Sequence, residues 1–262
     1  MPFVFANIFQ PLIDVADSVM VFFHNHVFHS WGMSIIALTI VVRAALIPLT
    51  LKQFKSMQTM QKLSPQIKEL QAKYKGDKQR LNQEMMKFYQ ENKVNPLGSC
   101  LPLAAQMPIF LALFYMLRKD LKVDICPGIH SYIAEHGGSL ANTACEKVAP
   151  GSAKFLFIPD LTHKATGSVL VVLIILYVGS QLASSLLMTV SADKNQRRMM
   201  LALPLVFVAF ILSFPAGLIV YWITTNTWTI LQQYIVKRTV GPMKPPELAM
   251  AGGGGGLGLK SL

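Results

Sequence analysis

Long apolar stretches alternate with polar ones along this sequence. Four stretches contain no Asp, Glu, Lys or Arg, and one more is equally apolar apart from a single arginine; in chain order the five span residues 32–51, 97–117, 166–190, 199–214 and 216–236. An α-helix needs roughly 17 to 25 residues to cross the hydrocarbon core of a bilayer, and the stretches have about this length. Pro215 alone separates the last two, which predicts a tight turn. We expect an all-α polytopic membrane protein with five transmembrane helices.

Residues 1–30 form a separate amphipathic segment. Polar side chains lie mostly away from an apolar face at helical spacing that contains Leu12, Val15, Val19, Phe22 and Phe23. This pattern is typical of a helix that lies in the headgroup plane. His24, His26 and His29 could suggest a metal site, but no Cys or suitably spaced carboxylate joins them. We therefore favour interfacial polar residues and expect no metal.

Residues 52–95 have a helical pattern of their own. Gly76-Asp77 divides two runs of apolar residues at spacings of three and four: Met60, Leu63, Ile67, Leu70 and Tyr74, then Leu81, Met85 and Phe88. The pattern predicts an antiparallel helical hairpin with a narrow apolar seam. Ser64 followed by Pro65 also predicts a fresh helix start, with Ser64 as N-cap and a bend there.

The distribution of charge predicts the orientation in the membrane. Residues 52–95 contain ten basic and four acidic residues, a net charge of +6, whereas residues 119–166 contain five of each. Because short cytoplasmic loops are enriched in Lys and Arg, we place the hairpin in the cytoplasm, the N-terminus and loop 119–165 outside, and the flexible tail 239–262 in the cytoplasm. The formal net charge of +11 then reflects topology and anionic headgroups rather than DNA binding.

Two of the three cysteines, Cys126 and Cys145, fall in the loop assigned to the outside. An extracytoplasmic oxidising compartment would allow them to form a disulfide, and pairing and free thiols both remain open at this point. Cys100 lies at the start of a predicted span, where a small packing residue is expected.

Arg43 is a cation well inside an apolar segment. A charge near the middle of a spanning helix costs roughly 2.5 to 3.5 kcal/mol on insertion scales, so it normally faces a protein interior or a wet cavity. Every Asp and Glu lies outside the predicted spans, so water and neutral groups must satisfy the five donors of the guanidinium. The candidates are the polar side chains within the spans, which would otherwise serve as interhelical hydrogen-bonding groups: Thr39, Gln106, Gln181, Ser184, Tyr221 and Thr225. We expect a hydrated cavity inside the bilayer.

Five motifs in this order resemble the YidC family of membrane protein insertases, the bacterial branch of the Oxa superfamily: IVVRAALIPLT from Ile40, QEMMKFY from Gln83, VNPLG from Val94, QMPIF from Gln106 and FPAGLIVYW from Phe214. The resemblance covers about residues 31–238 and implies a five-helix core around a hydrophilic groove that is open to the cytoplasm and lipid and closed outside. On the matching positions, Arg43 would be the groove cation, and Thr39 and Trp222 would line the substrate path.

The resemblance implies a membrane protein insertase and chaperone in the bacterial cytoplasmic (inner) membrane. It would admit hydrophilic parts of nascent membrane proteins into the groove and release their apolar segments to the lipid bilayer, alone or with the Sec translocon. A ribosome or the signal recognition particle pathway would be a further partner. The sequence contains no nucleotide-binding loop, HExxH or nucleophile elbow, so we expect neither an enzyme nor a cofactor.

The competing interpretation is a small secondary transporter or channel, because such proteins also bury charge at mid-membrane. A transporter would normally show internal repeats and a coupling carboxylate, and the five unequal spans offer neither. A third interpretation, a passive scaffold for other membrane proteins, predicts that Arg43→Ala is tolerated.

Overall fold

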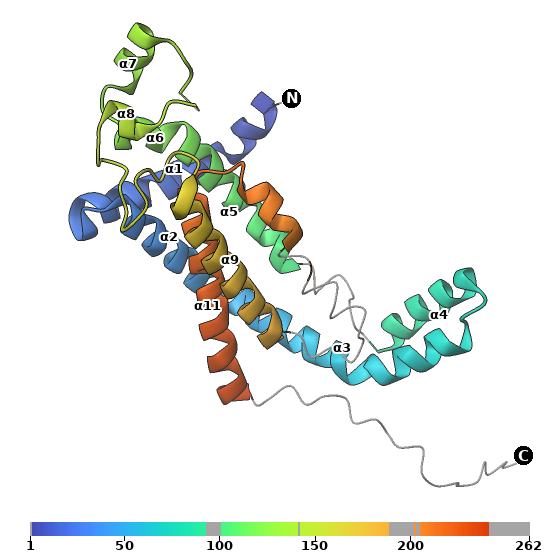
Figure 1. The fold of residues 1–262 in the computed structure, drawn as a ribbon. Helices are drawn as coiled ribbons and strands as arrows, with labels where there is room; N and C mark the ends of the chain where they lie inside the picture. Colours follow the sequence, from blue (N-terminus) through green and yellow to red (C-terminus); the bar gives the residue numbers. More distant parts are fainter. Residues whose placement is uncertain (1, 93–100, 141, 189–201, 203–204, 241–262) are drawn as a thin grey trace, which may run out of the picture.

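The structure is a computed structural model that describes residues 2–92, 101–140, 142–188, 202 and 205–240 (Figure 1). The described residues are mainly helical and contain two isolated β-bridges but no strand, which confirms the all-α prediction. The helices are α1 (Pro2–Phe23), α2 (Trp31–Ala45), α3 (Ile47–Lys73), α4 (Lys78–Glu91), α5 (Leu101–Arg118), α6 (Asp120–Ile125), α7 (Ile129–His136), α8 (Cys145–Val148), α9 (Gly167–Met188) and α11 (Ala216–Val240), with a π-helical turn at His24–Phe28.

Helix α11 lies between α2 and α9 and forms the centre of a bundle. Helix α5 contacts α11 from another side, and α1 packs across α2 and α5. The side chains between them are almost entirely apolar and include Ile35, Met116, Leu117, Leu218 and Ile219, all fully buried. These helices thus share one hydrophobic core, which holds their polar side chains at fixed depths.

The first predicted span is broken at Leu46. Helix α2 ends at Ala45, and the chain from Ile47 to Ser56 turns away from it by 57°. Pro48 explains the break, because proline has no N–H to donate and its ring would clash with the carbonyl of Ala44 in a continuous helix. It is tolerated at the start of α3, where the N–H would be unpaired in any case. The bend turns α3 away from the direction of α2.

The predicted fresh helix start at Ser64-Pro65 is wrong. Helix α3 runs through Pro65 to Lys73, and no N-cap forms at Ser64. An interior proline removes one backbone hydrogen bond, but a solvent-exposed helix can leave the freed carbonyl to water. The break at Gly76-Asp77 agrees with the structure: the Asp77 side chain accepts a hydrogen bond from the Arg80 N–H and caps α4, which packs back against α3. The hairpin projects away from the bundle (Figure 1).

Only part of the predicted set of spans is recognisable from helix length and hydropathy among the described residues. Gly167–Leu187 in α9 is long and apolar enough to cross a bilayer, with a mean hydropathy of 2.2. Trp31–Ala45 and Ile47–Ser56 pass the same test as one bent pair, and Gln106–Arg118 is a shorter apolar helix. Helix α11 covers the predicted span 216–236. Five residues of the predicted span 199–214 lie outside the described residues, and the rest show helix at 202 and 205–211. Five spans therefore remain a prediction.

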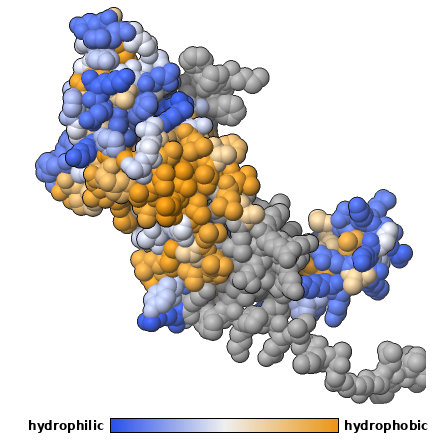
Figure 2. Space-filling view, viewed as in Figure 1, coloured by the Kyte–Doolittle hydropathy of each residue, from blue (hydrophilic) through white to orange (hydrophobic). Residues whose placement is uncertain are grey.

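On the face shown in Figure 2, apolar side chains form a band across the middle of the bundle, between the hydrophilic α6–α8 region and the hydrophilic hairpin. Large apolar side chains that are exposed come from several helices and include Val171, Ile175, Leu186, Val206, Phe210, Leu231 and Ile235. Monomeric soluble proteins rarely expose a contiguous apolar surface of this kind. The band indicates a surface that faces lipid.

Helix α1 uses two apolar faces. Val15 and Phe22, from the predicted membrane face, are more than half exposed, as expected of side chains that face lipid. Ile13 and Met20 are buried against the bundle, a contact that the sequence pattern did not predict. In the turn that follows, the ring of His24 stacks on Trp31 with centroids 3.8 Å apart. The amphipathic segment is thus packed onto the bundle as well as exposed.

The segment between α5 and α9 closes over one end of the bundle. The backbone N–H groups of Ala216 and Gly217, at the start of α11, donate to the carbonyls of His163 and Leu161 at 2.9 and 2.8 Å. These bonds satisfy donors that have no partner within their own helix. At the start of α2, the ring of Phe155 lies directly on Gly32, where a Cβ atom would be only 2.1 Å from the ring. The ends of α2 and α11 are therefore covered by this loop.

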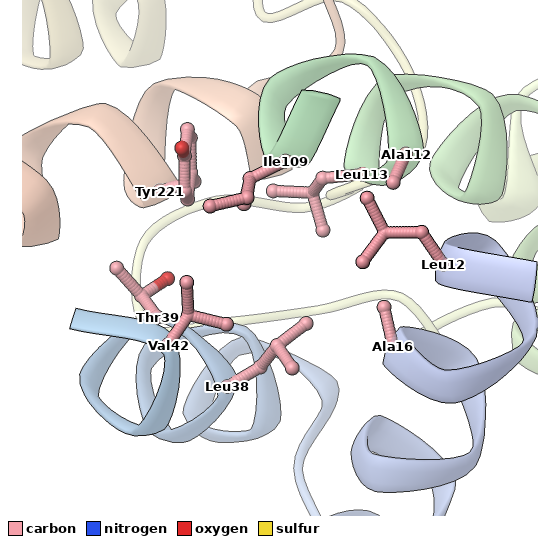
Figure 3. A pocket seen from close by; sticks show the side chains of 9 residues that line it. All are labelled: Leu12, Ala16, Leu38, Thr39, Val42, Ile109, Ala112, Leu113 and Tyr221. Carbon is pink, nitrogen blue, oxygen red and sulfur yellow. The ribbon is translucent and has the colours of Figure 1, made fainter. Parts of the chain in front are cut away.

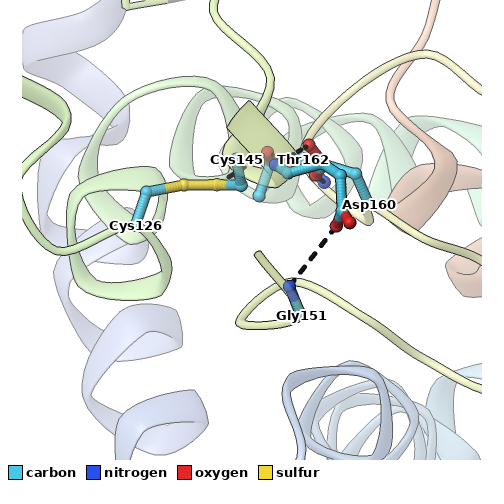
Figure 4. The surroundings of a disulfide bond; sticks show 6 residues. Cys126, Cys145, Gly151, Asp160 and Thr162 are labelled. Atoms are coloured by element: carbon cyan, nitrogen blue, oxygen red, sulfur yellow. Dashed lines mark hydrogen bonds between the residues drawn. A yellow bond between two sulfur atoms is a disulfide. The ribbon is translucent and has the colours of Figure 1, made fainter. Parts of the chain in front are cut away.

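A disulfide joins Cys126 and Cys145 within this loop, with Cα atoms 5.5 Å apart (Figure 4). The hydroxyl of Thr162 donates to the Asp160 carboxylate at 2.7 Å and lies 3.2 Å from the Cys145 sulfur. The Thr162 N–H also donates to Asp160, at 2.8 Å. The disulfide and the carboxylate thus fix the loop that supplies the Leu161 and His163 carbonyls.

Candidate functional site

Arg43 lies in the last turn of α2, just before the bend. Its side chain is half-buried, and the Nε atom is fully enclosed without a hydrogen-bond partner among the described residues. It interacts electrostatically with the Tyr221 side chain of α11. The guanidinium therefore sits inside the bundle beside a neutral hydroxyl rather than a carboxylate, and water or a bound molecule must supply the acceptors that it lacks.

Gln106 of α5 donates a side-chain hydrogen bond to the hydroxyl of Tyr221. The sequence analysis predicted that both residues lie in the groove but did not predict the hydrogen bond between them. Arg43 also interacts electrostatically with Tyr221, so polar side chains of α2, α5 and α11 lie together. Three of the predicted site residues therefore form one cluster, Arg43, Tyr221 and Gln106, which we call the arginine cluster.

A small cavity of about 40 Å³ lies beside the arginine cluster (Figure 3). It is lined by Leu12, Ala16, Leu38, Thr39, Val42, Ile109, Ala112, Leu113 and Tyr221, from four helices. Thr39 is buried, and its hydroxyl donates to the Ile35 carbonyl of its own helix at 2.7 Å. A buried water needs two to four polar partners, which these side chains do not provide. This cavity is apolar and is not the predicted hydrated cavity.

Trp222 packs in an aromatic cluster. Its ring stacks on Phe110 with centroids 5.5 Å apart and lies 6.0 Å from the ring of Tyr177 and 5.5 Å from that of Phe214. Tyr221 and Trp222 are adjacent in α11, and they contact Gln106 and Phe110, one turn apart on α5. Trp222 is half-buried, so part of its side chain is exposed.

The other predicted residues lie further along the bundle. Thr225 is buried on α11, one turn after Tyr221. Gln181 and Ser184 are on α9, close to Ser180, whose hydroxyl accepts a hydrogen bond from the Asn226 side chain at 3.2 Å. This contact places them against α11 more than one turn beyond the arginine cluster. The structure thus gathers Arg43, Tyr221 and Gln106 in one place and puts Gln181 and Ser184 further along α11.

The sequence analysis missed a second polar cluster where the start of α3 meets the end of α11. The amide of Gln232 donates to the hydroxyl of Thr50 across this junction. Gln53 is buried, and its Nε2 atom has no hydrogen-bond partner among the described residues; the same is true of Oε1 of Gln233. Gln53 follows Lys52, just outside the apolar stretch, so periodicity alone gave no reason to place it in the interior. We call Thr50, Gln53, Gln232 and Gln233 the glutamine junction.

Lys122 is a further buried cation, in the loop that covers the bundle. It is fully buried, and its Nζ has no hydrogen-bond partner among the described residues. Burial lowers the pKa of the Lys122 amine, the nearby Asp160 carboxylate opposes this effect, and Arg118 adds to it. Asp160 is already held by Thr162. The amine therefore lacks a dedicated partner in its folded position.

The sequence matches the family described as 60Kd inner membrane protein over residues 22–243. A membrane protein insertase YidC from Streptomyces avermitilis is 37% identical over 239 residues, an alignment that covers 84% of this chain and 54% of that protein. The membrane protein insertase YidC from Geobacter sulfurreducens is 34% identical over 237 residues, covering 90% of this chain and 38% of that protein.

Among solved structures, the fold is similar to the crystal structure of an active YidC insertase with its first transmembrane domain resolved. The TM-score is 0.60 at 25% sequence identity, and the match covers 90% of this chain and 47% of that one. The chain thus spans about half, or less, of the length of these relatives.

Proposed function

We propose that this chain, which belongs to the 60Kd inner membrane protein family, acts as an insertase for nascent membrane proteins. The single observation that carries the proposal is Arg43, a half-buried cation inside an apolar bundle with an enclosed Nε that has no protein partner among the described residues. A cation in this position is costly unless water or a transient ligand solvates it. In an insertase, the buried cation would interact with polar parts of the client, which explains why the protein keeps it despite its free-energy cost.

The mechanism involves no bond chemistry. Polar parts of a client protein are expensive to bring to membrane depth, at several kcal/mol per unsatisfied group. Water around the arginine cluster would solvate these parts, and Arg43 would attract acidic side chains of a translocated tail. Its field acts more strongly there than in bulk water because the surrounding helices are apolar. The polar side chains along α11 continue this path beyond Tyr221.

Release into lipid would supply the driving force. The exposed apolar band includes side chains of α9 and α11 that an apolar client segment can slide along before it partitions into the bilayer. Each buried CH₂ group stabilises the inserted segment by about 0.8 kcal/mol, so a spanning segment outweighs the transient cost of its polar flank. The half-exposed Trp222 lies on such a route.

The proposed orientation places α3 and α4 in the cytoplasm and the α6–α8 loop outside. The +6 charge of residues 52–95 supports it. The carbonyls of Leu161 and His163 that cap α11, and the ring of Phe155 on Gly32, support a bundle closed on the outer side. The groove would then open to the cytoplasm and to lipid. The resemblance to the insertase family also leads us to propose the Sec translocon, a ribosome and the signal recognition particle pathway as partners.

Reconstitution into liposomes tests the proposal. Purified protein in sealed vesicles of neutral and anionic phospholipids should insert a small single-span client with a short acidic tail, scored by protection of the tail from added protease. Empty vesicles and vesicles with unfolded protein are the controls. Solute flux without client insertion would instead support a transporter, and insertion no faster than in empty vesicles would refute the function.

A further inference from the structure

The loop that covers the bundle contains a tight turn at residues 155–158. The backbones of Phe155 and Ile158 exchange two hydrogen bonds, of 2.9 and 2.8 Å, so Leu156 and Phe157 form a two-residue tip between them. Both flanking side chains are buried, whereas Leu156 is 72% exposed and Phe157 45%. The turn therefore presents two large apolar side chains outward, and we call Leu156 and Phe157 the apolar tip.

Turn chemistry does not account for these two residues. Leu156 has a φ of 51°, in the left-handed region where tight turns favour glycine, asparagine or aspartate. A bulky side chain with a positive φ is a costly exception. Such exceptions persist mainly where a side chain makes a functional contact. The apolar tip thus points to a contact that the described part of the chain does not supply.

The turn lies level with the ends of two bundle helices. The ring of Phe155 packs on Gly32 in the first turn of α2, and the Leu161 carbonyl accepts a hydrogen bond from the Gly217 N–H at the start of α11. These are the points where the predicted spans 32–51 and 216–236 begin. In a bilayer this level is the boundary between the acyl chains and the headgroups.

A second turn presents apolar side chains beside the same helix end. Val27 and Phe28, in the π-helical turn before α2, are both exposed, and the ring of His24 in this turn stacks on Trp31. Trp31 precedes Gly32, so the two turns pack on consecutive residues of α2. Apolar side chains from two separate segments at one helix end are typical of a surface that meets the plane of a membrane.

We propose that the apolar tip inserts among the lipid acyl chains of the adjacent leaflet and anchors the covering loop to the membrane. Lys154, exposed beside the tip, can lay its stem along the apolar boundary and reach lipid phosphates with its amine. Leu161 and His163 follow in the same loop, so the anchor and the carbonyls that cap α11 belong to one short segment. In the proposed orientation the leaflet is the outer one. The anchor does not depend on insertase activity.

Spin-label accessibility in reconstituted vesicles locates the tip. With Cys100 changed to Ser and the native disulfide intact, a nitroxide is attached to Phe157→Cys, to Ile175→Cys on the exposed face of α9, or to Ala134→Cys on α7, at the far end of the loop region (Figure 1). Molecular oxygen concentrates in the bilayer, whereas a nickel chelate stays in water. The label at position 157 should collide severalfold more with oxygen than with nickel, as at position 175 and unlike position 134.

A label at position 157 that favours nickel, as at position 134, would overturn the inference. A label shielded from both reagents would assign the tip to a protein contact, either a partner or a second copy of this chain, and would also overturn it. Neither reading requires client insertion, so failure of the proposed function would leave this test intact.

A reporter beside the tip tests anchoring itself. A nitroxide on Lys154→Cys should gain nickel access severalfold when the tip is replaced by Leu156→Gly with Phe157→Ser, because glycine keeps the turn conformation and only the apolar surface is lost. Val123→Ser, at another exposed apolar position of the loop, is the matched control and should change nothing. Unchanged access in the tip variant would overturn the inference. A marked loss of its thermal stability in detergent would assign the tip to the fold instead, with the same consequence.

Discussion

The Gln106 amide on α5 donates a hydrogen bond to the Tyr221 hydroxyl on α11, across 115 residues of sequence. Tyr221 is buried and Gln106 half-buried, and the bond fixes α5 to α11 beside Arg43. Polar groups at membrane depth are satisfied by neighbouring helices in this way. The same pair therefore aligns the bundle and presents a neutral polar surface to the guanidinium.

Tyr221→Phe should lower the free energy of unfolding in detergent by about 0.5 to 1.5 kcal/mol, because it removes the hydrogen bond that the half-buried Gln106 amide donates. The double variant Tyr221→Phe with Gln106→Leu should recover most of this loss, since neither side chain then carries an unpaired group. Thermal unfolding of the two single variants and the double variant measures the coupling. Additive losses would show that the bond does not hold the helices together.

Gly32→Ala should destabilise the covering loop, because its Cβ would lie 2.1 Å from the Phe155 ring. The ring must shift, at a cost of about 1 to 3 kcal/mol for an overpacked contact. Phe155→Leu in the same chain should relieve part of the clash. Gly179→Ala is the control, since a Cβ at Gly179 meets nothing within 4 Å. Equal thermal stability of Gly32→Ala and Gly179→Ala would contradict the contact.

Lys122→Met should stabilise the protein at neutral pH by about 1 to 3 kcal/mol, because it removes a buried amine that has no hydrogen-bond partner. Burial lowers the pKa of Lys122 from its ordinary value of 10.5. Between the lowered pKa and 10.5 the unfolded chain binds more protons than the folded one, so the stability of the wild type rises with pH there. The advantage of Lys122→Met should therefore shrink as the pH approaches 10.5.

Thermal unfolding of Lys122→Met across this pH range, beside the exposed control Lys119→Met, tests the effect. A stability difference that does not depend on pH would show that the pKa of Lys122 is the same in the folded and unfolded states.

The disulfide makes the proposed orientation measurable. With the α6–α8 loop outside, a membrane-impermeant thiol reagent added to intact cells should label Cys126 and Cys145 only after mild reduction, and should spare Cys100. Labelling that requires broken cells would reverse the orientation. The double variant Cys126→Ser, Cys145→Ser should lose about 3 kcal/mol of stability, as expected for a crosslink that closes a loop of 19 residues.

Charge-free apolar stretches and, in the hairpin, the spacing of apolar residues were sufficient to predict most of the helices. The bounds of α9 and α11 agree with the predicted spans to within a few residues, and Gly76-Asp77 ends the first arm of the hairpin as expected. Proline was a less reliable guide. Pro48 breaks the chain direction while Pro65 lies within a continuous helix. Whether a proline ends a helix or is accommodated within it depends on the residues packed around it, and the sequence alone does not reveal those contacts.

The candidate site was predictable in its members but not in its contacts. Arg43 was found because a charge in an apolar segment is costly, whichever neighbours it has. The bond between Gln106 and Tyr221 depends on how α5 and α11 pack, and no local pattern encodes that. Gln53 escaped notice because its burial results from the bend at Leu46, which brings the start of α3 to the end of α11.

The central claim is that the positive charge of Arg43 in a hydrated groove assists the passage of polar client segments. Insertion by reconstituted vesicles should be compared for wild type, Arg43→Lys and Arg43→Ala, each with a client that carries an acidic tail and a twin whose acidic residues are changed to amides. We predict that Arg43→Lys keeps most of the wild-type rate and that Arg43→Ala slows the acidic client about tenfold or more, and the twin far less. Equal rates for Arg43→Ala and wild type on the acidic client would contradict the claim.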